Sequence, residues 1–192
     1  MSDILFVRHA ATEMAGRFCG HSDPDLNPLG QTQLAELVTT LAGEQIDRVY
    51  SSDLKRALST AHAIAAAHGV ALETRPALRE IHFGEWEGRH WEEIQRKNLY
   101  YAHRWLAEFP RLPAPSGETF REFEARVLAE ISDLLDNQPG PIAVVTHAGV
   151  LRVVLQHFCG RSDSEAWRET KPYCCVVRYT ALRSSALTGA TR

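Results

Sequence analysis

The stretch ILFVRHAAT at residues 4–12 and the stretch IAVVTHAGV at residues 142–150 decide the fold of this chain. Each begins with four consecutive apolar residues and then reaches a polar pair that ends in histidine, Arg8-His9 or Thr146-His147. A short apolar run bounded by polar residues is typical of a strand that is buried on both faces. Because the carboxyl ends of parallel strands meet at one edge of a sheet, we expect the two histidines to lie close together.

The rest of the chain alternates between strand and helix patterns. Further strands are expected at residues 48–50, 70–74 and 173–179, and helices at about 29–43, 54–69, 117–138 and 148–158. The sequence Ser51-Ser52-Asp53 is a plausible N-cap region for the second helix, and residues 10–28 are expected to form a loop. The pattern predicts an α/β fold, a three-layer sandwich with a mostly parallel central sheet and helices on both faces.

Residues 82–116 interrupt this alternation with a segment rich in aromatic residues and closed by prolines. We expect residues 1–192 to form one domain in which residues 82–116, approximately, are an inserted helical lid. The lid aromatics either line a substrate pocket or form the lid's own core, and the sequence leaves both interpretations open. They are Trp86, Trp91, Tyr100, Tyr101, Trp105 and Phe109.

The composition is that of an ordinary globular protein. The chain has 192 residues, 44% of them hydrophobic and 23% charged, and 21 Lys and Arg against 24 Asp and Glu give a formal net charge of -3. This mild acidity gives no general attraction for nucleic acid or for an anionic membrane, so we expect neither as a partner. An anionic ligand would have to be held by a local cluster of basic groups.

The sequence predicts a cytoplasmic protein. It contains no basic segment leading into a signal-like apolar stretch, and no apolar run approaches the roughly 20 residues of a membrane span. The four cysteines lack a Cys-x-x-Cys pair, and we expect them to be small buried groups in a reducing compartment.

The polar residues that follow the predicted strands suggest phosphate chemistry. Arg8 and His9 follow the first strand, His147 follows the late one, and Arg56 lies in the first turns of the helix after Ser51-Ser52. The planar guanidinium group matches phosphate oxygens, and imidazole can form a covalent intermediate with a phosphoryl group. A proton donor for the leaving oxygen is still needed, and Glu80 follows a strand-like segment.

Several motifs resemble those of the histidine phosphatase superfamily, which has the phosphoglycerate mutase-like fold. The sequence RHAAT at residues 8–12 resembles its Arg-His-Gly-Glu-Thr signature. The resemblance continues in order through residues 20–33, YSSDLKRA at 50–57, LREIHFGEWEG at 78–88 and VTHAGV at 145–150. It therefore runs over nearly the whole chain.

The resemblance implies a role for each of the principal site residues. His9 would be the nucleophile that becomes phosphohistidine, and Glu80 would be the general acid. Arg8, Arg56 and His147 would bind the phosphoryl oxygens, and the predicted substrate contacts also include Thr12, Gly20 and Ala148. The resemblance implies no cofactor and no metal, and the other histidines show no ligand-like spacing.

Three alanines depart from the pattern of the superfamily. Ala10 replaces the usual glycine after the nucleophile, and Ala11 replaces a usual Glu or Gln. Ala15 stands where many members carry an asparagine that faces the phosphate. We expect Ala10 to be tolerated because it is the smallest such change, and Ala15 to remove one hydrogen bond.

The lid sequence favours one branch of the superfamily. FGEWEG at residues 83–88 differs from the Tyr-Gly-x-Leu-Gln-Gly of phosphoglycerate mutases, and together with PSGETF at 115–120 it is similar to the α-ribazole phosphatases of cobalamin assembly. The alternatives are a phosphatase of broad specificity for sugar phosphates and other small phosphoesters, a mutase, and a phosphate-binding module without turnover. A homodimer is possible if the last strand lies at a sheet edge.

Overall fold

The computed structural model describes residues 2–181 and contains one five-stranded sheet. The strand order is β3-β2-β4-β1-β5. The strands are β1 (Ser2–Arg8), β2 (Arg48–Ser51), β3 (Ala71–Thr74), β4 (Ile142–Thr146) and β5 (Val176–Ala181). Neighbours among the first four are parallel, and β5 pairs antiparallel with β1 at the edge of the sheet. The prediction of a mostly parallel sheet is confirmed.

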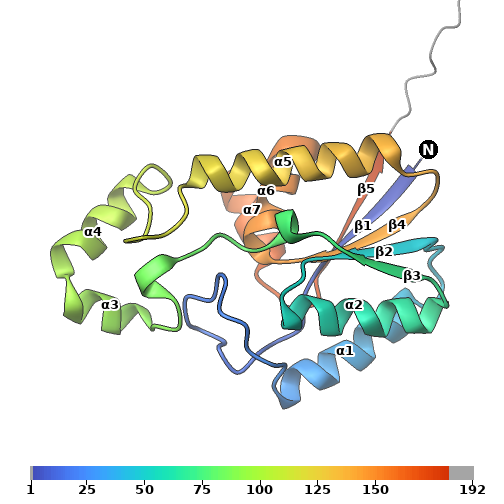
Figure 1. Cartoon of the computed structure of the whole chain (residues 1–192), viewed down its shortest axis with the longest axis horizontal. Helices are drawn as coiled ribbons and strands as arrows, with labels where there is room; N and C mark the ends of the chain where they lie inside the picture. The colour runs from blue at the N-terminus through green and yellow to red at the C-terminus, as the bar shows by residue number, and fades with distance from the viewer. Residues whose placement is uncertain (1, 182–192) are drawn as a thin grey trace, which may run out of the picture.

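Helices cover both faces of this sheet, which gives the predicted three layers. Figure 1 shows α1 and α2 below the sheet and α5 above it. The helix α6 packs on the same face of the sheet as α5, and α7 packs against α6. The helices are α1 (Pro28–Leu41), α2 (Lys55–His68), α3 (Trp91–Lys97), α4 (Leu99–Glu108), α5 (Phe120–Asn137), α6 (Ala148–Cys159) and α7 (Asp163–Thr170), and the short 3-10 turns are η1 (Pro76–Leu78) and η2 (Gly84–Trp86).

The strict alternation of side chains along the buried strands divides the core in two. In β1, Ile4 and Phe6 belong to the cluster under α5 and α6, whereas Leu5 and Val7 belong to the cluster under α1 and α2. β4 alternates in the same way. Continuous apolar runs are needed because both faces of these strands are covered by helices.

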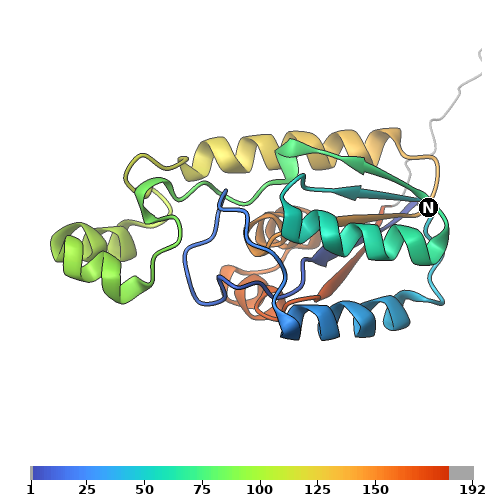
Figure 2. The ribbon, with the colours of Figure 1, turned by 60° about the horizontal axis from the view of Figure 1, so that its bottom comes forward.

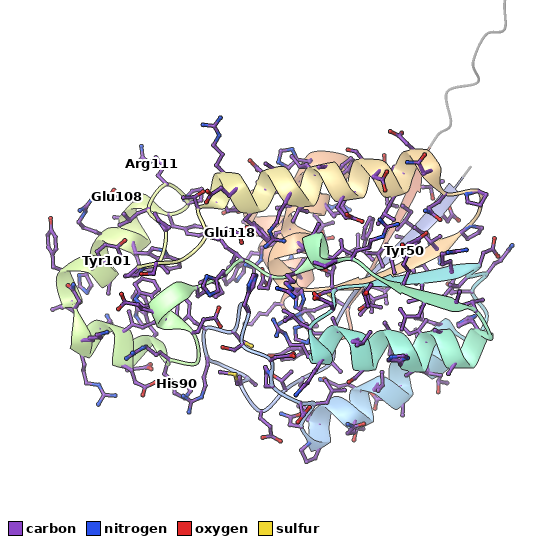
Figure 3. The ribbon with its side chains drawn as sticks, in the orientation of Figure 1. Tyr50, His90, Tyr101, Glu108, Arg111 and Glu118 are labelled. Carbon is purple, nitrogen blue, oxygen red and sulfur yellow. The ribbon has the colours of Figure 1, made fainter. Side chains whose placement is uncertain are left out.

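The helices α3 and α4 stand apart from the three layers. Figures 1 and 2 show them beyond the carboxyl ends of the parallel strands, with the loop of residues 10–27 lying between them and the sheet. A small separate core holds them together, with Trp86, Ile94 and Ala102 buried at its centre. The hydroxyl of Tyr101, labelled in Figure 3, donates to the Pro113 carbonyl at 2.9 Å and ties α4 to the returning chain.

The start of α2 differs from the sequence expectation. This helix begins at Lys55, so the expectation of a cap within residues 51–53 is wrong. Asp53 is not available for capping because its carboxylate accepts two hydrogen bonds from Arg79, at 2.7 and 2.5 Å. The N–H of Lys55 donates instead to Asp23, at 2.6 Å, so the long loop supplies the acceptor.

The carboxyl-terminal region also differs from expectation. The last strand begins at Val176 and not at Tyr173, because Cys174 has a left-handed backbone with φ of +55° and cannot continue a strand. The helix α7, which was not expected, precedes this turn. The expected fraying beyond Arg183 falls outside the described residues.

Two further expectations concern the cysteines and membrane-spanning segments. The four cysteines are free but only half-buried, so the expectation of full burial is wrong. Within these residues, none of the helices combines the length and the apolar character that crossing a membrane requires.

Candidate active site

The carboxyl ends of β1 and β4 bring the two predicted histidines together. Arg8 is paired with Thr146 in the parallel ladder, and the N–H of His9 donates to the Thr146 carbonyl at 3.0 Å. The next residue on each strand is therefore a histidine at the same edge, and the ring centroids of His9 and His147 are 5.1 Å apart. The two histidines lie side by side, as the strand pattern predicts.

A cavity of about 260 Å³ opens at this edge, between the sheet and the lid. Six of the eight residues predicted for the site line it, and His147 and Gly20 do not. The predicted residues on its wall are Arg8, His9, Thr12, Arg56, Glu80 and Ala148, and the others are Met14, Gly16, Arg17, Phe18, Cys19, Phe83, Trp91, Arg152 and Tyr173.

His9 is buried except for a small part that reaches the cavity, with 7% of the residue exposed. Its Nδ1 lies 2.7 Å from the Ala10 carbonyl, and its Nε2 accepts from Nε of Arg56 at 3.3 Å. This pairing assigns the ring proton to Nδ1, which leaves the Nε2 lone pair as the nucleophilic site. Burial, followed by the charge of Arg56, holds the pKa of His9 well below 6.5, so the ring is neutral at pH 7.

His147 lies behind His9 and is fully buried. Its Nε2 is 2.9 Å from the hydroxyl of Ser52, and its Nδ1 has no hydrogen-bond partner among the described residues. The Ser52 hydroxyl also accepts from the N–H of Leu54 at 3.3 Å, so it connects His147 to the backbone that leads into α2. Burial lowers the pKa of His147 well below 6.5, so this ring is also neutral.

The loop of residues 19–22 holds the Arg56 guanidinium in place. Nη1 donates to the carbonyl of Ser22 at 2.6 Å, and Nη2 donates to the carbonyls of Gly20 and Cys19 at 2.7 and 3.3 Å. With Nε on His9, this arginine spans the loop and the nucleophile. It is 1% exposed, so its positive charge is built into the floor of the cavity.

Arg8 is held from the opposite side, by the end of α7. Its Nη1 donates to the carbonyl of Thr170 at 2.9 Å and to that of Lys171. Its guanidinium lies 4.0 Å from the ring centroid of Tyr173 in a cation–π contact. The rings of Tyr173 and His9 are also in contact, with 5.7 Å between centroids. The turn before β5 therefore forms part of the site.

Glu80 reaches the cavity from the segment after η1. Its two carboxylate oxygens accept from the N–H groups of Ile81 and Gly149, each at 2.9 Å. Arg126 fixes the backbone here, because it donates to the Glu80 carbonyl at 3.0 Å and forms a bidentate pair with Glu118. Glu118, labelled in Figure 3, lies on the segment that joins the lid to α5.

Gly20, predicted as a substrate contact, has a different position. Its N–H donates to Glu87 at 3.0 Å and its carbonyl accepts from Arg56, so both of its backbone polar groups are occupied by protein. A Cβ at this position would lie 2.1 Å from the Ile81 carbonyl oxygen and 2.4 Å from Oε1 of Glu87. Glycine is required here because two segments of backbone approach closely.

This arrangement can transfer a phosphoryl group. It contains a neutral imidazole whose Nε2 lone pair accepts from Arg56, two fixed guanidinium groups and a carboxyl group, all at one cavity. The histidine phosphatase superfamily (branch 1) matches the chain over residues 4–186. The chain belongs to this superfamily.

The relatives of this histidine phosphatase include phosphoserine phosphatases and α-ribazole phosphatases. It is 33% identical over 172 residues to phosphoserine phosphatase 1 of Hydrogenobacter thermophilus, covering 87% of this chain and 81% of the relative. The chain is 30% identical over 169 residues to the adenosylcobalamin/α-ribazole phosphatase of Escherichia coli K12, and the match covers 85% of this chain and 82% of the relative. The crystal structure of the α-ribazole phosphatase from Shigella flexneri superposes with a TM-score of 0.86 at 26% identity, covering 94% of this chain and 91% of that one. This protein is a phosphomonoesterase of that superfamily.

The three alanines that depart from the motifs of the superfamily are accommodated differently. Ala10 and Ala11 are buried, and their N–H groups donate to Thr60 and Gln33 at 3.2 and 3.0 Å. Ala15 is exposed and does not line the cavity of this histidine phosphatase. Its neighbours Met14 and Gly16 line the cavity instead.

The lid aromatics divide between the two interpretations that the sequence left open. Phe83 and Trp91 line the cavity, together with Phe18 from the long loop. Trp86 and Trp105 pack against each other with 5.1 Å between centroids and do not line it. In this histidine phosphatase the lid therefore has its own aromatic core and also presents aromatic faces to the cavity.

Sequence reasoning missed Arg152 and Tyr173, although one of them had a signal. Arg152 comes four residues after Ala148, and residues at that spacing lie on one face of a helix. The helix after His147 was expected, so this spacing predicts a shared face. Tyr173 had no such signal because it lies in a turn where the sequence pattern predicts a strand.

No group of three or more His, Cys, Asp or Glu side chains in residues 2–181 is placed to hold a metal ion.

Proposed function

We propose that this protein hydrolyses small phosphomonoesters through a phosphohistidine formed at Nε2 of His9. The observation that carries the proposal is the state of His9, which is neutral, has its proton on Nδ1 and lies at the cavity beside Arg56. A neutral imidazole with its lone pair on Nε2 is the form that can attack phosphorus, once Arg56 has turned its hydrogen bond to the phosphoryl oxygens.

In the first step, Nε of Arg56 releases its hydrogen bond to Nε2 of His9. Nε2 then attacks phosphorus while the bond from phosphorus to the alcohol oxygen breaks. Arg8 and Arg56 offset the charge of the phosphoryl oxygens, and the proposal gives His147, whose ring lies beside that of His9, the role of a further donor to them. Glu80, in its protonated form, gives its proton to the departing alcohol oxygen. The products of the step are the free alcohol, phosphohistidine and the Glu80 carboxylate.

In the second step, the Glu80 carboxylate takes a proton from a water molecule whose oxygen attacks the phosphohistidine. The bond between phosphorus and Nε2 breaks, inorganic phosphate leaves, and the protonated Glu80 and neutral His9 are regenerated. One carboxyl group serves both steps because the alcohol and the water occupy the same side of phosphorus. Its orientation is fixed by the N–H groups of Ile81 and Gly149.

We include the lid in the proposal, with residues 82–116 as a cover over the cavity of one catalytic domain. Trp91 from α3 and Phe83 from the start of the lid line the same cavity as the catalytic groups. A cover of this kind excludes water from the reacting phosphoryl group until the alcohol has left.

The first substrate candidate is α-ribazole 5′-phosphate. The support is the aromatic surface formed by Phe18, Phe83 and Trp91, because stacking of a flat base on an aromatic ring contributes about 1–3 kcal/mol. A relative of similar length carries the name adenosylcobalamin/α-ribazole phosphatase.

The second candidate is a smaller phosphomonoester that carries an acidic group, such as phosphoserine. A cavity of about 260 Å³ is below the range of about 300–1,000 Å³ that is usual for drug-sized ligands, so it suits a compact substrate. Arg17 and Arg152 add positive charge to its wall beyond the two arginines assigned to the phosphoryl group.

We also propose a cytoplasmic location, and a homodimer that forms through the free edge of β5. The support for the location is the composition, and the support for the dimer is the edge position of β5 in the sheet. Sedimentation equilibrium of the purified chain tests the dimer.

Release of phosphate from para-nitrophenyl phosphate tests the proposed activity. The wild-type protein should turn it over without added metal, and His9→Ala should reduce the rate to that of the buffer. Equal rates from the two proteins would end the proposal. The rates with α-ribazole 5′-phosphate and with phosphoserine then rank the two substrate candidates.

A further inference from the structure

Arg152 is a cation of the cavity wall that the proposed mechanism does not use. It lies one turn after Ala148 on α6, and both residues line the cavity. In residues 2–181 it forms no ion pair, and the wall of the cavity carries a single carboxylate, that of Glu80. No carboxylate among these residues therefore forms a direct ion pair with its guanidinium group.

The side chain of Arg152 is fixed from behind by α7. Its Nε donates to Oγ1 of Thr170 at 3.2 Å, and its guanidinium lies 3.7 Å from the ring centroid of Trp167. The carbonyl of the same Thr170 accepts from Arg8. Thr170, at the end of α7, thus holds the guanidinium groups of Arg8 and Arg152 at the same cavity. Two positive charges held in this way favour the binding of an anion between or beside them.

The terminal nitrogens of Arg152 are available to a ligand. Neither Nη1 nor Nη2 has a protein partner within the described part of the chain. Arg56 differs, because its terminal nitrogens donate to three carbonyls, and Nη1 of Arg17 donates to the Gly88 carbonyl at 2.8 Å. Arg152 therefore presents both ends of its planar fork, the geometry that binds a carboxylate or a phosphate through two hydrogen bonds.

The position of Arg152 on α6 places it on the leaving-group side of the cavity. The first turn of this helix holds the general acid, since the N–H of Gly149 donates to Glu80 at 2.9 Å. Burial lowers the pKa of Arg152 and the Glu80 carboxylate opposes that shift, as expected for charges that lie within range of each other. The general acid must be next to the leaving oxygen, so Arg152 is near the part of the substrate that departs as the alcohol.

We propose that Arg152 binds a second anionic group on the leaving-group part of the substrate. The substrate class is then a compact phosphomonoester that bears a carboxylate, or a second phosphate, a few atoms from the bond that breaks. This inference rests on the proposed phosphatase activity and selects the second of the two substrate candidates. α-Ribazole 5′-phosphate carries no second anionic group and would gain nothing from Arg152.

Matched pairs of substrates test the site in the wild-type protein. Phosphoserine and phosphoethanolamine differ by one carboxylate, as do 3-phosphoglycerate and glycerol 1-phosphate. A fructose 1,6-bisphosphate and fructose 6-phosphate pair tests a second phosphate in the same way. We expect kcat/KM to be about 10- to 100-fold higher for the carboxylate-bearing member, which is the effect of one charge-assisted hydrogen-bonded pair. A preference confined to the bisphosphate pair would assign the second phosphate as the ligand.

Substitution at Arg152 shows whether this residue produces the preference. Arg152→Gln should remove the preference for the anionic member, chiefly through KM, and should leave kcat/KM for phosphoethanolamine and para-nitrophenyl phosphate within about threefold of wild type. Arg152→Lys should retain part of the preference, because it keeps the charge and loses the fork. Arg168→Gln, which removes an exposed arginine of α7, is the control and should change nothing.

Three results would overturn the inference. The first is a wild-type protein that hydrolyses para-nitrophenyl phosphate but shows no preference within any pair. The second is an Arg152→Gln variant that keeps the preference, and the third is one that loses the same factor with every substrate, which would place Arg152 at the transferred phosphoryl group. A wild-type protein with no activity on any phosphomonoester would instead refute the proposed function.

Trp167→Leu, a change at an exposed residue, releases the Arg152 guanidinium from its stacking contact. It should therefore also weaken the preference for the substrate with the second anionic group.

Discussion

Replacing Glu87 by glutamine should destabilise the protein and disturb the site, although Glu87 does not line the cavity. Its carboxylate accepts five hydrogen bonds at distances from 2.6 to 3.0 Å. They come from the N–H groups of Gly20, His21, Ser22 and Phe83 and from the Ser22 hydroxyl. The carboxylate therefore fastens the loop whose carbonyls hold Arg56 to the segment that leads into the lid.

The size of the effect follows from the number of donors. Glutamine keeps one acceptor oxygen and turns the other into an NH₂ group, which faces at least two N–H groups and cannot accept from them. Hydrogen bonds to charged groups contribute about 1.5–3 kcal/mol each, so the loss of two should lower the free energy of unfolding by about 3–6 kcal/mol. Because the loop also positions Arg56, kcat/KM should fall by about tenfold or more.

Denaturation in urea at pH 7, with kcat/KM measured on the folded variant, provides the assay. Glu85→Gln is the matched control, because Glu85 is exposed on the same turn and its carboxylate pairs, within residues 2–181, only with Lys97 at 3.2 Å. Its change in the free energy of unfolding should stay within about 0.5 kcal/mol. The reasoning is refuted if Glu87→Gln is as stable as wild type, or if the two variants are equally destabilised.

The pH dependence of stability gives a second readout of the same contacts. Burial alone would raise the pKa of Glu87, but the hydrogen bonds hold it below its ordinary 4.5. A depressed carboxyl pKa contributes stability above the unfolded value and loses it as the pH falls through the folded one. The stability difference between wild type and Glu87→Gln should therefore narrow below pH 4.5.

Glu80, His9 and Gly149 can each be tested at the same cavity. Glu80→Gln should lose far more rate with a poor leaving group, such as a sugar alcohol, than with para-nitrophenolate, which needs little protonation; equal losses would remove Glu80 from the acid role. Burial and the charge of Arg56 hold the pKa of His9 well below 6.5, and the neutral ring is the nucleophile. With para-nitrophenyl phosphate, whose leaving group needs little protonation by Glu80, kcat/KM should therefore show no loss from protonation of His9 above pH 6.5, and an acid limb centred above 6.5 would contradict the assignment. Gly149→Ala places a Cβ 2.1 Å from Oε1 of Glu80, so kcat should fall by about tenfold or more while the circular dichroism spectrum stays unchanged. Gly43→Ala is the control and should leave kcat unchanged, because a Cβ there meets nothing within 4 Å.

The sheet and the central site could be predicted because their signals are local and strong. The apolar runs at residues 4–7 and 142–145 require burial on both faces, and parallel strands bring their carboxyl ends together. The adjacency of His9 and His147 follows from these two facts. Glu80 could be predicted because it follows a strand-like segment, and Arg56 because it lies in the first turn of the helix after a strand. Both positions place the side chain near the same edge of the sheet.

The second layer of the site could not be predicted, because it depends on contacts between segments that are distant in sequence. Nothing local indicates that Arg8 is held by the carbonyl of Thr170, 162 residues away. The helix α7 is short and polar, but Ser162 and Glu165 form a capping box whose Ser-x-x-Glu spacing is visible in the sequence. That signal, with the helical spacing of Ala148 and Arg152, would have located the missing wall of the cavity.

The position of Gly20 shows a different limit. Its place in a motif suggested contact with substrate, whereas the structure uses it for the close approach of two backbone segments. A motif identifies which residue type is needed and does not say which neighbour requires it. Here the neighbours are Glu87 and the Ile81 carbonyl, which the fold brings together from outside the motif.

Trapping the phosphorylated enzyme tests the central claim most directly. The protein is mixed briefly with a radioactive phosphomonoester, quenched in denaturant and analysed by peptide mapping. The mechanism predicts a label that is stable in alkali, labile in acid and located on the peptide that contains His9, and it predicts no label in His9→Ala. A label that persists in His9→Ala, or one that maps to another residue, would contradict the account.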